Sequence, residues 1–569
     1  WAMALLLQIC TSTSLTSPPY TRFTPRVHFT PRCYLSKPAH DIAAAIWDDR
    51  SSLWHVFAGC WSEGGWQHLV SADLLAWTPL GTPSAFGGTG GLVFDSTNSS
   101  RDDEPRQLVA YASTLSTWLG SGANFTTWAA QGRQFDGTGN DPILWHDARD
   151  GRWYAATAAR PGYGLEDYWS SPALTGPTVS WEHLASPLLV NHNLSLPRVA
   201  PLPQTREFVS PDFFPLQRGG FAGKGAAGHD EDWVFLTSTY GRPYDGASSF
   251  YNFANFFVGQ RPAPGGPFTP RTFGSALFPN TPSSNSGVFD WSCFYPTNST
   301  SASSSQAGYD LELATANGLT QFGCCPKTAA QGSRRVMFGW LQNGGSNDEP
   351  SRAGIASSNN TMTLPRELTL APDGVTMLQA FVPELRRLRR AHFSATAVAA
   401  PAGGVGAAQF FEGPAASGAQ LEIRATFELT AARQAAAGTA AGGHFGLLVL
   451  AARGGSSGGG DGSAPSDERT VIGFDIARQL VFLDRTASGA AMDADVRAGP
   501  WPTAAAGAAF ITVHAFVDHS VVSLIAANET AISAWVHPQG GASTGVALWA
   551  DVDGVTLTSI DIWVLADSN

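Results

Sequence analysis

The sequence predicts an all-β fold in two domains, a β-propeller followed by a β-sandwich. Its 569 residues exceed what one ordinary hydrophobic core encloses, so we expect two domains. The chain holds 61 Gly, 37 Pro and 19 Trp, but only 14% of its residues are charged, against about 25% in an average domain. That composition is typical of many short strands joined by turns.

The region 26–388 repeats apolar and aromatic runs that are separated by Asp and Gly turns. Asp150–Gly151 lies between two aromatic runs and predicts a hairpin turn. Repeated hairpins over about 350 residues suit a propeller, whose blades are four-stranded sheets around a centre. The runs that carry this prediction are Leu53–Trp61, Pro142–Ala159, Asp232–Tyr240 and Arg334–Leu341.

The composition changes at 389–404, which we predict to be a linker, and 405–569 then reads as the sandwich. Apolar and polar residues alternate with a period of two, as in strands with one buried face. The predicted strands lie in Gln420–Leu429, Val471–Ile476, Leu480–Gly489 and Ile511–Ala526.

Charge and hydropathy exclude some partners. The net charge of −12 does not attract nucleic acid. The one basic cluster, Glu384–Arg390, is predicted to be a solvated face or an inter-domain contact. No run reaches the ~18 apolar residues that span a membrane.

Several features bear on where the protein resides. Residues 1–25 include a short apolar stretch, Ala4–Ile9, that is either the remnant of a signal peptide or part of a disordered terminus. The six cysteines form no C-x-x-C spacing, so we expect no zinc site, and they are too few for a disulfide scaffold. Six N-x-S/T sequons favour an extracellular, cell-wall or vacuolar location: Asn98, Asn124, Asn193, Asn298, Asn359 and Asn528.

An ordered set of motifs resembles glycoside hydrolase family 32, the invertases and fructan hydrolases. The segment "WQHLVSADLLAW" (Trp66–Trp77) is similar to the family's W-G-H-x-x-S-x-D-L-x-x-W, and "SPDFFP" (Ser210–Pro215) to its E-C-P-D-F-x-P strand. The resemblance implies a five-bladed propeller and a retaining glycosidase that needs no cofactor. Further matches, in the family's order, are Asn140–Tyr154, Phe289–Pro296, Arg334–Leu341, Leu364–Leu370, Leu483–Gly489 and Phe516–Ser520.

Two of the family's three acidic positions are present. By resemblance, Asp41 in "HDIAA" is the nucleophile, although His40 stands where the family has Asn. Asp141 matches the transition-state stabiliser of the R-D-P segment, with Asn140 in place of Arg. A carboxylate that binds substrate hydroxyls more strongly in the transition state accelerates the reaction.

The third acidic position, the acid/base, is Val209, which cannot donate a proton. A general acid contributes about 10²–10⁴-fold when the leaving group is poor. Glu207 lies two residues earlier, on the same side of a strand, and is either a displaced acid/base or an ordinary surface carboxylate. We expect a bulge near Ser210 to absorb part of the displacement. Asp212 matches a supporting residue in the family's pattern.

A sugar site also needs flat apolar faces beside groups that bind hydroxyls. The resemblance places Trp66 and His68 near the substrate, with Trp61, Phe86 and Trp291 as plausible neighbours.

Two functions are therefore open. One is a retaining β-fructofuranosidase-like hydrolase or fructosyltransferase that acts on sucrose or fructans. The other is a non-catalytic carbohydrate-binding protein, because the acid/base is replaced.

Overall fold

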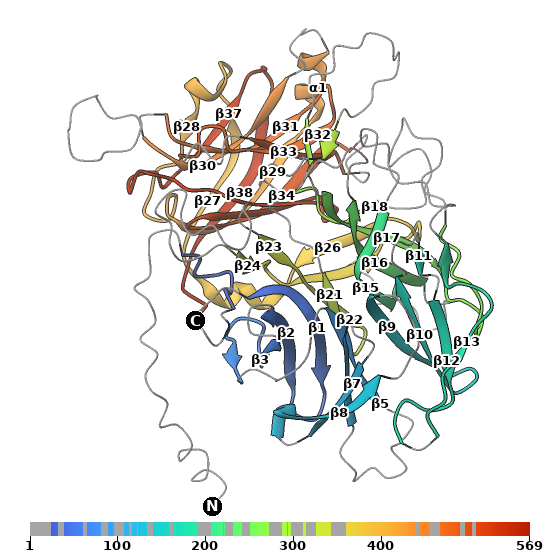
Figure 1. The fold of residues 1–569 in the computed structure, drawn as a ribbon. Coiled ribbons are helices and arrows are strands. Elements are labelled where there is room, and N and C mark those ends of the chain that lie inside the picture. The colour runs from blue at the N-terminus through green and yellow to red at the C-terminus, as the bar shows by residue number, and fades with distance from the viewer. Residues whose placement is uncertain are drawn as a thin grey trace, which may run out of the picture.

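The computed structural model has two β domains, with the propeller below the sandwich in Figure 1. Three short 3-10 helices and one α-helix accompany the strands among the residues described here: η2 (Ala123–Phe125), η4 (Pro383–Leu388), η5 (Val405–Ala407) and α1 (Thr430–Ala436). None of the helices in this part of the chain is long and apolar enough to span a membrane. The structure describes residues 24–31, 33, 39–60, 65–80, 89–95, 107–112, 116–121, 123–133, 140–158, 164–165, 167–176, 178–190, 206–219, 221, 232–241, 251–271, 287–292, 294–296, 311–313, 326–342, 360–437, 443–453, 467–489, 495–502 and 508–568.

Five four-stranded antiparallel sheets form the propeller, as predicted. In chain order the blades are β1 (His40–Asp48), β2 (Leu53–Cys60), β3 (Gly65–Ser71) and β4 (Thr78–Pro79); β5 (Gly90–Asp95), β6 (Gln107–Ala112), β7 (Ser116–Ser121) and β8 (Thr127–Arg133); β9 (Asn140–Asp147), β10 (Arg152–Ala158), β12 (Asp167–Ser171) and β13 (Glu182–His183); β15 (Arg206–Leu216), β16 (Asp232–Gly241), β17 (Tyr251–Gln260) and β18 (Gly287–Val288); and β21 (Lys327–Gln331), β22 (Arg334–Phe338), β25 (Arg366–Leu370) and β26 (Met377–Phe381). Three two-stranded pairs complete it: β11 (Gly164–Leu165) with β14 (Leu189–Val190), β19 (Phe294–Pro296) with β20 (Leu311–Leu313), and β23 (Trp340–Gln342) with β24 (Asn360–Met362).

The first strand of each blade is its inner strand, and the five inner strands close a ring. β1 contacts β5, β5 contacts β9, β9 contacts β15, β15 contacts β21, and β21 returns to β1. Aromatic side chains fill the spaces between blades: Phe338 of the last blade packs against Trp54 and Trp77 of the first, with ring centroids 6.1 and 5.8 Å apart. The predicted turn at Asp150–Gly151 is present between β9 and β10, where Gly151 has a φ of 70°.

The second domain is a sandwich of two six-stranded sheets, as predicted. Phe427 of one sheet packs on Phe445 and Phe474 of the other, at 5.1 and 5.7 Å between centroids. In spatial order the sheets are β27 (Arg389–Ala399), β38 (Thr556–Leu565), β29 (Gln420–Glu428), β34 (Phe510–Asp518), β35 (Val521–Ala526) and β36 (Thr530–Trp535); and β28 (Gln409–Phe410), β37 (Gly545–Ala550), β30 (His444–Ala451), β31 (Thr470–Asp475), β32 (Leu480–Asp484) and β33 (Val496–Pro500).

The predicted linker at 389–404 is wrong for most of its length. Arg389–Ala399 is strand β27, which pairs with β38 at the edge of the sandwich. It is an edge strand, and all of its side chains are half-buried or exposed. The sequence of this strand therefore shows no clear alternation of buried apolar and exposed polar residues by which a strand could be predicted.

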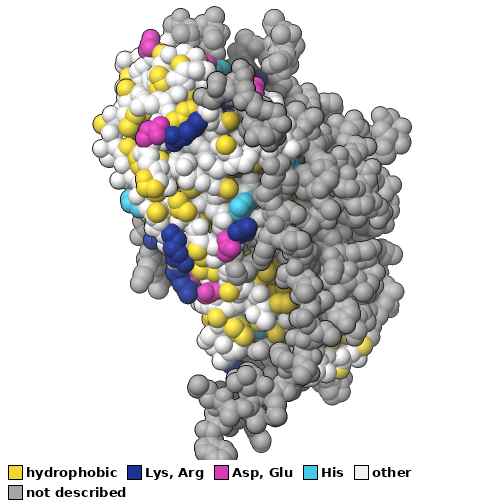
Figure 2. Space-filling model, turned by 90° about the vertical axis from the view of Figure 1, so that its left-hand side faces the viewer, with side chains coloured by type: hydrophobic (Ala, Val, Ile, Leu, Met, Phe, Trp, Pro, Cys, Tyr) yellow, Lys and Arg dark blue, Asp and Glu magenta, His cyan; other side chains and the backbone are white. Residues whose placement is uncertain are grey.

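The basic cluster Glu384–Arg390 lies at the junction of the two domains. Arg386 and Arg387 are exposed, and Arg387 pairs with Asp73 of the first blade at 3.0 Å. Arg389 lies over the Trp563 ring, 3.7 Å from its centroid, and donates two hydrogen bonds to Glu422. Burial opposes ionisation of Glu422, but the hydrogen bonds from Arg389 and His514 lower its pKa to about 2. On the described surface in Figure 2, charged side chains are sparse among apolar and neutral ones.

A buried polar network joins the propeller to the sandwich. Arg366 of β25 and Asp290, both without exposed side-chain surface, form an ion pair at 2.8 Å. Arg366 also donates to Ser533 Oγ of β36, at 3.0 Å. Breaking such a pair on one side costs about 3–5 kcal/mol, because it leaves a buried charge uncompensated.

The first described segment of the chain is also bound to the sandwich. The carboxylate of Asp518 accepts hydrogen bonds from the backbone N–H groups of Arg26, Val27 and His28, and from His28 Nδ1. Burial favours the neutral form of Asp518, but the hydrogen bonds from these donors outweigh burial and lower the pKa of Asp518. The "FVDHS" motif thus ties the first described segment to β34 of the sandwich.

We predict that replacing His444 removes a pH-dependent part of the sandwich's stability. Its ring lies 3.3 Å from Asp475 and 2.7 Å from Asp551. The hydrogen bond to Asp475 makes the largest contribution, and together with the bond to Asp551 it raises the pKa of His444 from 6.5 to about 8. Burial acts in the opposite direction and lowers this pKa. Because the folded state favours the protonated His444 ring, this ring stabilises the fold fully below pH 6.5. The stabilisation is lost as the pH rises through about 8, where the ring loses its proton.

Urea unfolding of the wild type and of His444→Gln from pH 6 to pH 9 measures this effect. The difference in unfolding free energy should shrink as the pH rises. His392→Gln, at the more exposed pair of His392 with Asp561, is the matched control and should cost no more than about 1 kcal/mol. A pH-independent difference for His444→Gln would contradict the assignment.

Candidate active site

Three inner strands carry β-bulges near the candidate site. In β1, Asp41 is an extra residue between the pairs His40–Gly59 and Ile42–Ala58. In β9, the two residues Asp141 and Pro142 lie opposite the single residue Thr157 of β10. In β15, Ser210 and Pro211 likewise lie opposite Thr237 of β16. A bulge bends its strand and re-aims the local side chains.

Asp141 is held at the bulge of β9 by the neighbouring blade. Its side chain is 7% exposed, and its Oδ2 accepts a hydrogen bond from Ser210 N at 3.0 Å. Asp141 and Ser210 both adopt left-handed backbone conformations, with φ of 53° and 50°. Each precedes a proline, and such conformations persist only where the surroundings enforce them. The two strained residues therefore support one another.

Asp41 occupies the corresponding place in the first blade. It is the second residue of β1, as Asp141 is of β9. Blades that each begin with their inner strand are related by rotation about the ring, so the starts of these strands meet at one end. Asp41 is half-buried, whereas Ile42, Ala43 and Ala44 are buried. The ring thus brings two carboxylates to one end of the propeller.

The acid/base position lies in β15, directly before the bulge. Glu207 pairs with Tyr240 and Val209 with Ser238, in continuous register. The predicted bulge at Ser210 is present, but it begins after Val209, so it adds no residue between Glu207 and Val209. The bulge therefore leaves the spacing of Glu207 and Val209 along the strand unchanged. The side chains of Glu207, Val209 and Asn140 lie outside what the structure describes.

Asp212 fastens β15 to the last blade, in keeping with a supporting role. Its Oδ2 accepts hydrogen bonds from Thr328 N at 2.8 Å and from Thr328 Oγ1 at 2.6 Å. Next to it, the buried Lys327 donates from Nζ to the carbonyl oxygen of Pro211 at 2.7 Å. Sequence reasoning had not assigned Ser210, Lys327 or Thr328 to the site. The available signal was the Lys-Thr pair that begins the inner strand β21.

Tyr111 links the second blade to β9. Its hydroxyl accepts a hydrogen bond from Leu144 N at 3.3 Å and is buried. Burial and then the charge of Asp212 raise the pKa of Tyr111. The hydroxyl therefore stays protonated and neutral at any physiological pH.

Two predicted substrate-binding residues lie inside the first blade. Trp66 has no exposed surface and packs edge-on against Phe57. His68 is 2% exposed, stacks on Phe57 at 4.1 Å, and its Nε2 lies 2.9 Å from Nδ1 of His55. Burial lowers the pKa of His68 to about 3 and that of His55 to about 4, so both rings are neutral at pH 7. In this structure neither residue has a face that a sugar could reach.

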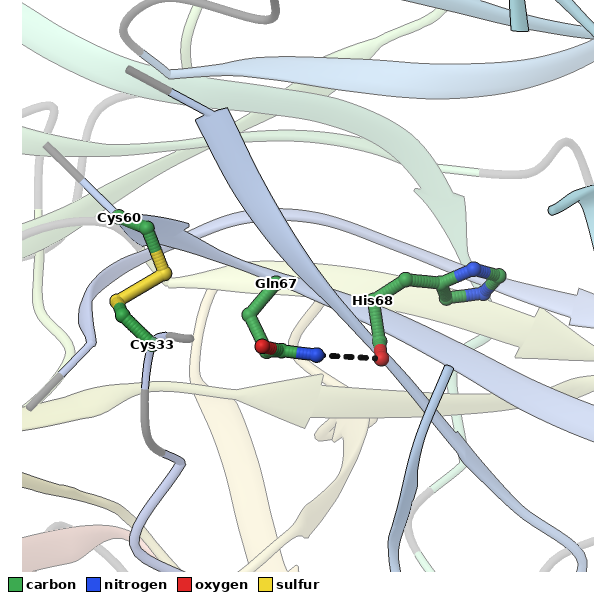
Figure 3. The surroundings of a disulfide bond; sticks show 4 residues. All are labelled: Cys33, Cys60, Gln67 and His68. Atoms are coloured by element: carbon green, nitrogen blue, oxygen red, sulfur yellow. Dashed lines mark hydrogen bonds between the residues drawn. A yellow bond between two sulfur atoms is a disulfide. The ribbon is translucent and has the colours of Figure 1, made fainter. Parts of the chain in front are cut away.

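A disulfide joins Cys33 to Cys60 beside this blade, as Figure 3 shows. It closes a loop that contains all of β1, including Asp41. Gln67 lies between the disulfide and His68 and donates to the carbonyl oxygen of His68 at 3.2 Å. The bridge thus ties the segment before β1 to the end of β2.

The remaining predicted neighbours divide into two groups. Trp61 and Phe86 lie outside the described residues. Trp291 is 5% exposed and packs against Gly499 of the sandwich, in the domain interface.

Among the residues that the structure describes, no group of three or more His, Cys, Asp or Glu could hold a metal ion.

Comparisons with known proteins agree with this architecture. Residues 384–564 match the family model for the C-terminal domain of glycosyl hydrolases family 32. No curated protein matches the chain.

Solved structures match nearly the whole chain. The exo-inulinase from Aspergillus awamori aligns with a TM-score of 0.65 at 17% identity, over 97% of this chain and 100% of that one. The fructan 1-exohydrolase IIa from Cichorium intybus gives 0.65 at 15% identity, over 97% and 98%. The fructofuranosidase from Schwanniomyces occidentalis gives 0.66 at 14% identity, over 97% and 100%.

These findings confirm the resemblance drawn from the motifs. Residues 384–564 match the C-terminal domain of glycosyl hydrolases family 32, and over nearly its whole length the chain shares its propeller-and-sandwich fold with these solved enzymes.

Proposed function

We propose that this chain binds a β-fructosyl unit at the end of the propeller where Asp41 and Asp141 meet, and that it cleaves fructosides as a retaining β-fructofuranosidase. The observation that carries the proposal is the pair of bulges that present these two carboxylates on inner strands. The similar structures include one fructofuranosidase complexed with fructose and one complexed with fructosyl-erythritol. For this chain the substrate class is sucrose or a fructan.

The two carboxylates have different parts in this mechanism. Asp41, half-buried and therefore reachable, attacks the anomeric carbon. The bond from that carbon to the leaving-group oxygen breaks, the leaving group departs with its electron pair, and a fructosyl-enzyme ester remains. Asp141 is fixed by Ser210 N–H and receives hydroxyl hydrogen bonds that strengthen as positive charge develops on the ring. Water then hydrolyses the ester and restores the Asp41 carboxylate.

The protonation step is the weak point, because Val209 stands at the acid/base position. Release of an alkoxide from sucrose is slow without a proton donor. The alternative function is therefore carbohydrate binding without hydrolysis, and the Val209 substitution is the observation that favours it. A substrate whose leaving group departs without a proton distinguishes the two functions, because an enzyme with a working nucleophile cleaves it and a binding protein does not.

We predict that β-fructosyl fluoride is cleaved much faster than sucrose, by about 10²–10⁴-fold in kcat, since fluoride departs without protonation. Asp41→Asn should abolish cleavage of both substrates while leaving the melting temperature near that of the wild type. Glu207→Gln is the informative second variant. If it removes residual sucrose cleavage but spares the fluoride, then Glu207 is the displaced acid.

Two outcomes would contradict the enzymatic proposal. Cleavage of the fluoride that survives Asp41→Asn would remove the assigned nucleophile. Failure to cleave either substrate, with fructose still bound in calorimetry, would leave carbohydrate binding as the function.

We also propose that the chain matures in the secretory pathway, with an extracellular, cell-wall or vacuolar destination. The Cys33–Cys60 bridge supports this, because disulfides persist in oxidising compartments. Asn528, in the sequon with Thr530, is exposed at the turn between β35 and β36.

Peptide mapping of protein secreted from a eukaryotic host should find Cys33 linked to Cys60 and a glycan on Asn528. Asn528→Gln is the matched control for the glycan. Free thiols at both cysteines together with an unmodified Asn528 would contradict secretory maturation.

A further inference from the structure

The bulge of β15 is the point where three blades are joined. Ser210 N donates to Asp141 of the third blade at 3.0 Å. The carbonyl oxygen of Pro211 accepts from Lys327 Nζ of the fifth blade at 2.7 Å. Asp212 accepts from the backbone and hydroxyl of Thr328, at 2.8 and 2.6 Å. Three consecutive residues of β15 are therefore each fixed by a neighbouring blade.

The lysine in this junction is unusual because it is buried. Lys327 is 4% exposed and sits on β21 opposite Phe338, whose side chain is fully buried. An ammonium group in such surroundings is costly unless hydrogen bonds compensate for the lost water. The short bond to the Pro211 carbonyl is a charge-assisted bond of this kind.

The backbone that Lys327 holds is strained. Ser210 has a φ of 50° and precedes a proline, a strained combination that persists only when external contacts enforce it. Asp141 holds the N–H at one end of Ser210–Pro211, and Lys327 holds the carbonyl at the other end. Release of either end allows the dipeptide to relax, and the Ser210 N–H then moves away from Asp141.

We propose that Lys327 is a positioning residue of the candidate active site: through the Pro211 carbonyl it keeps Ser210 N–H directed at Asp141. Lys327 itself does not touch the substrate in this account. Its catalytic consequence rests on the proposed function, whereas its effect on the position of Asp141 does not. A displacement of about 1 Å at such a group is enough to cost about 10²-fold in rate.

The test compares Lys327→Met, which keeps the length and removes the donor, with Lys327→Arg, which restores a charged donor. A crystal structure of each variant gives the Ser210 N–Asp141 Oδ2 distance. Kinetics with β-fructosyl fluoride give kcat and KM, and calorimetry gives fructose affinity. Arg390→Met, at an exposed arginine of β27, is the surface control.

Lys327→Met is expected to fold, to lengthen the Ser210–Asp141 contact beyond 3.5 Å, and to lower kcat about 10- to 100-fold with a much smaller change in KM. Lys327→Arg should recover part of kcat. If Lys327→Met does not fold, Lys327→Gln, which keeps a neutral donor, should give an intermediate loss of kcat.

A folded Lys327→Met protein with an unchanged Ser210–Asp141 contact and wild-type kcat would overturn the proposal. Wild-type kcat in both the Gln and the Arg variants, if Met does not fold, would do the same. A wild type that neither cleaves the fluoride nor binds fructose would refute the proposed function instead, and the variant structure would still decide whether Lys327 positions Asp141.

Discussion

The hydrogen bond from Ser210 N to Asp141 is the constraint on which the site depends. It joins two residues that are both left-handed and that both precede a proline, on neighbouring inner strands. Neither conformation is stable by itself, so each strand holds the other in place. A carboxylate fixed in this way loses little entropy when substrate binds, which suits a group that must stabilise developing charge.

The sandwich supports this arrangement from outside the site. The propeller blades are held in their ring by side-chain packing and by hydrogen bonds between blades, such as that from Ser210 N to Asp141. The buried pair of Arg366 and Asp290, together with Ser533, connects the last two blades to the sandwich. Asp518 connects the segment that precedes the first blade to the same domain. The second domain therefore braces the place where the ring closes, between the fifth and first blades.

Much of the fold could be predicted because its signals are local. Alternating runs and the Asp150–Gly151 turn mark strands and a hairpin without reference to the rest of the chain. The bulges could not be placed reliably, because they depend on pairing with strands such as β16 that lie far along the chain. Burial of Trp66 depends on packing in the assembled blade, and the Cys33–Cys60 pairing is one of 15 that six cysteines allow. Only ordered motifs pointed to Asp41 and Asp141, since a lone aspartate is usually a turn residue.

The central claim is that the ring brings Asp41 and Asp141 together as a fructosyl site. A crystal structure of the protein with fructose tests it most directly. The account predicts one fructose at the start of the inner strands, with Asp141 bound to ring hydroxyls and the Asp41 carboxylate next to the anomeric carbon. Fructose bound elsewhere, or Asp41 turned away from a sugar that Asp141 holds, would contradict it.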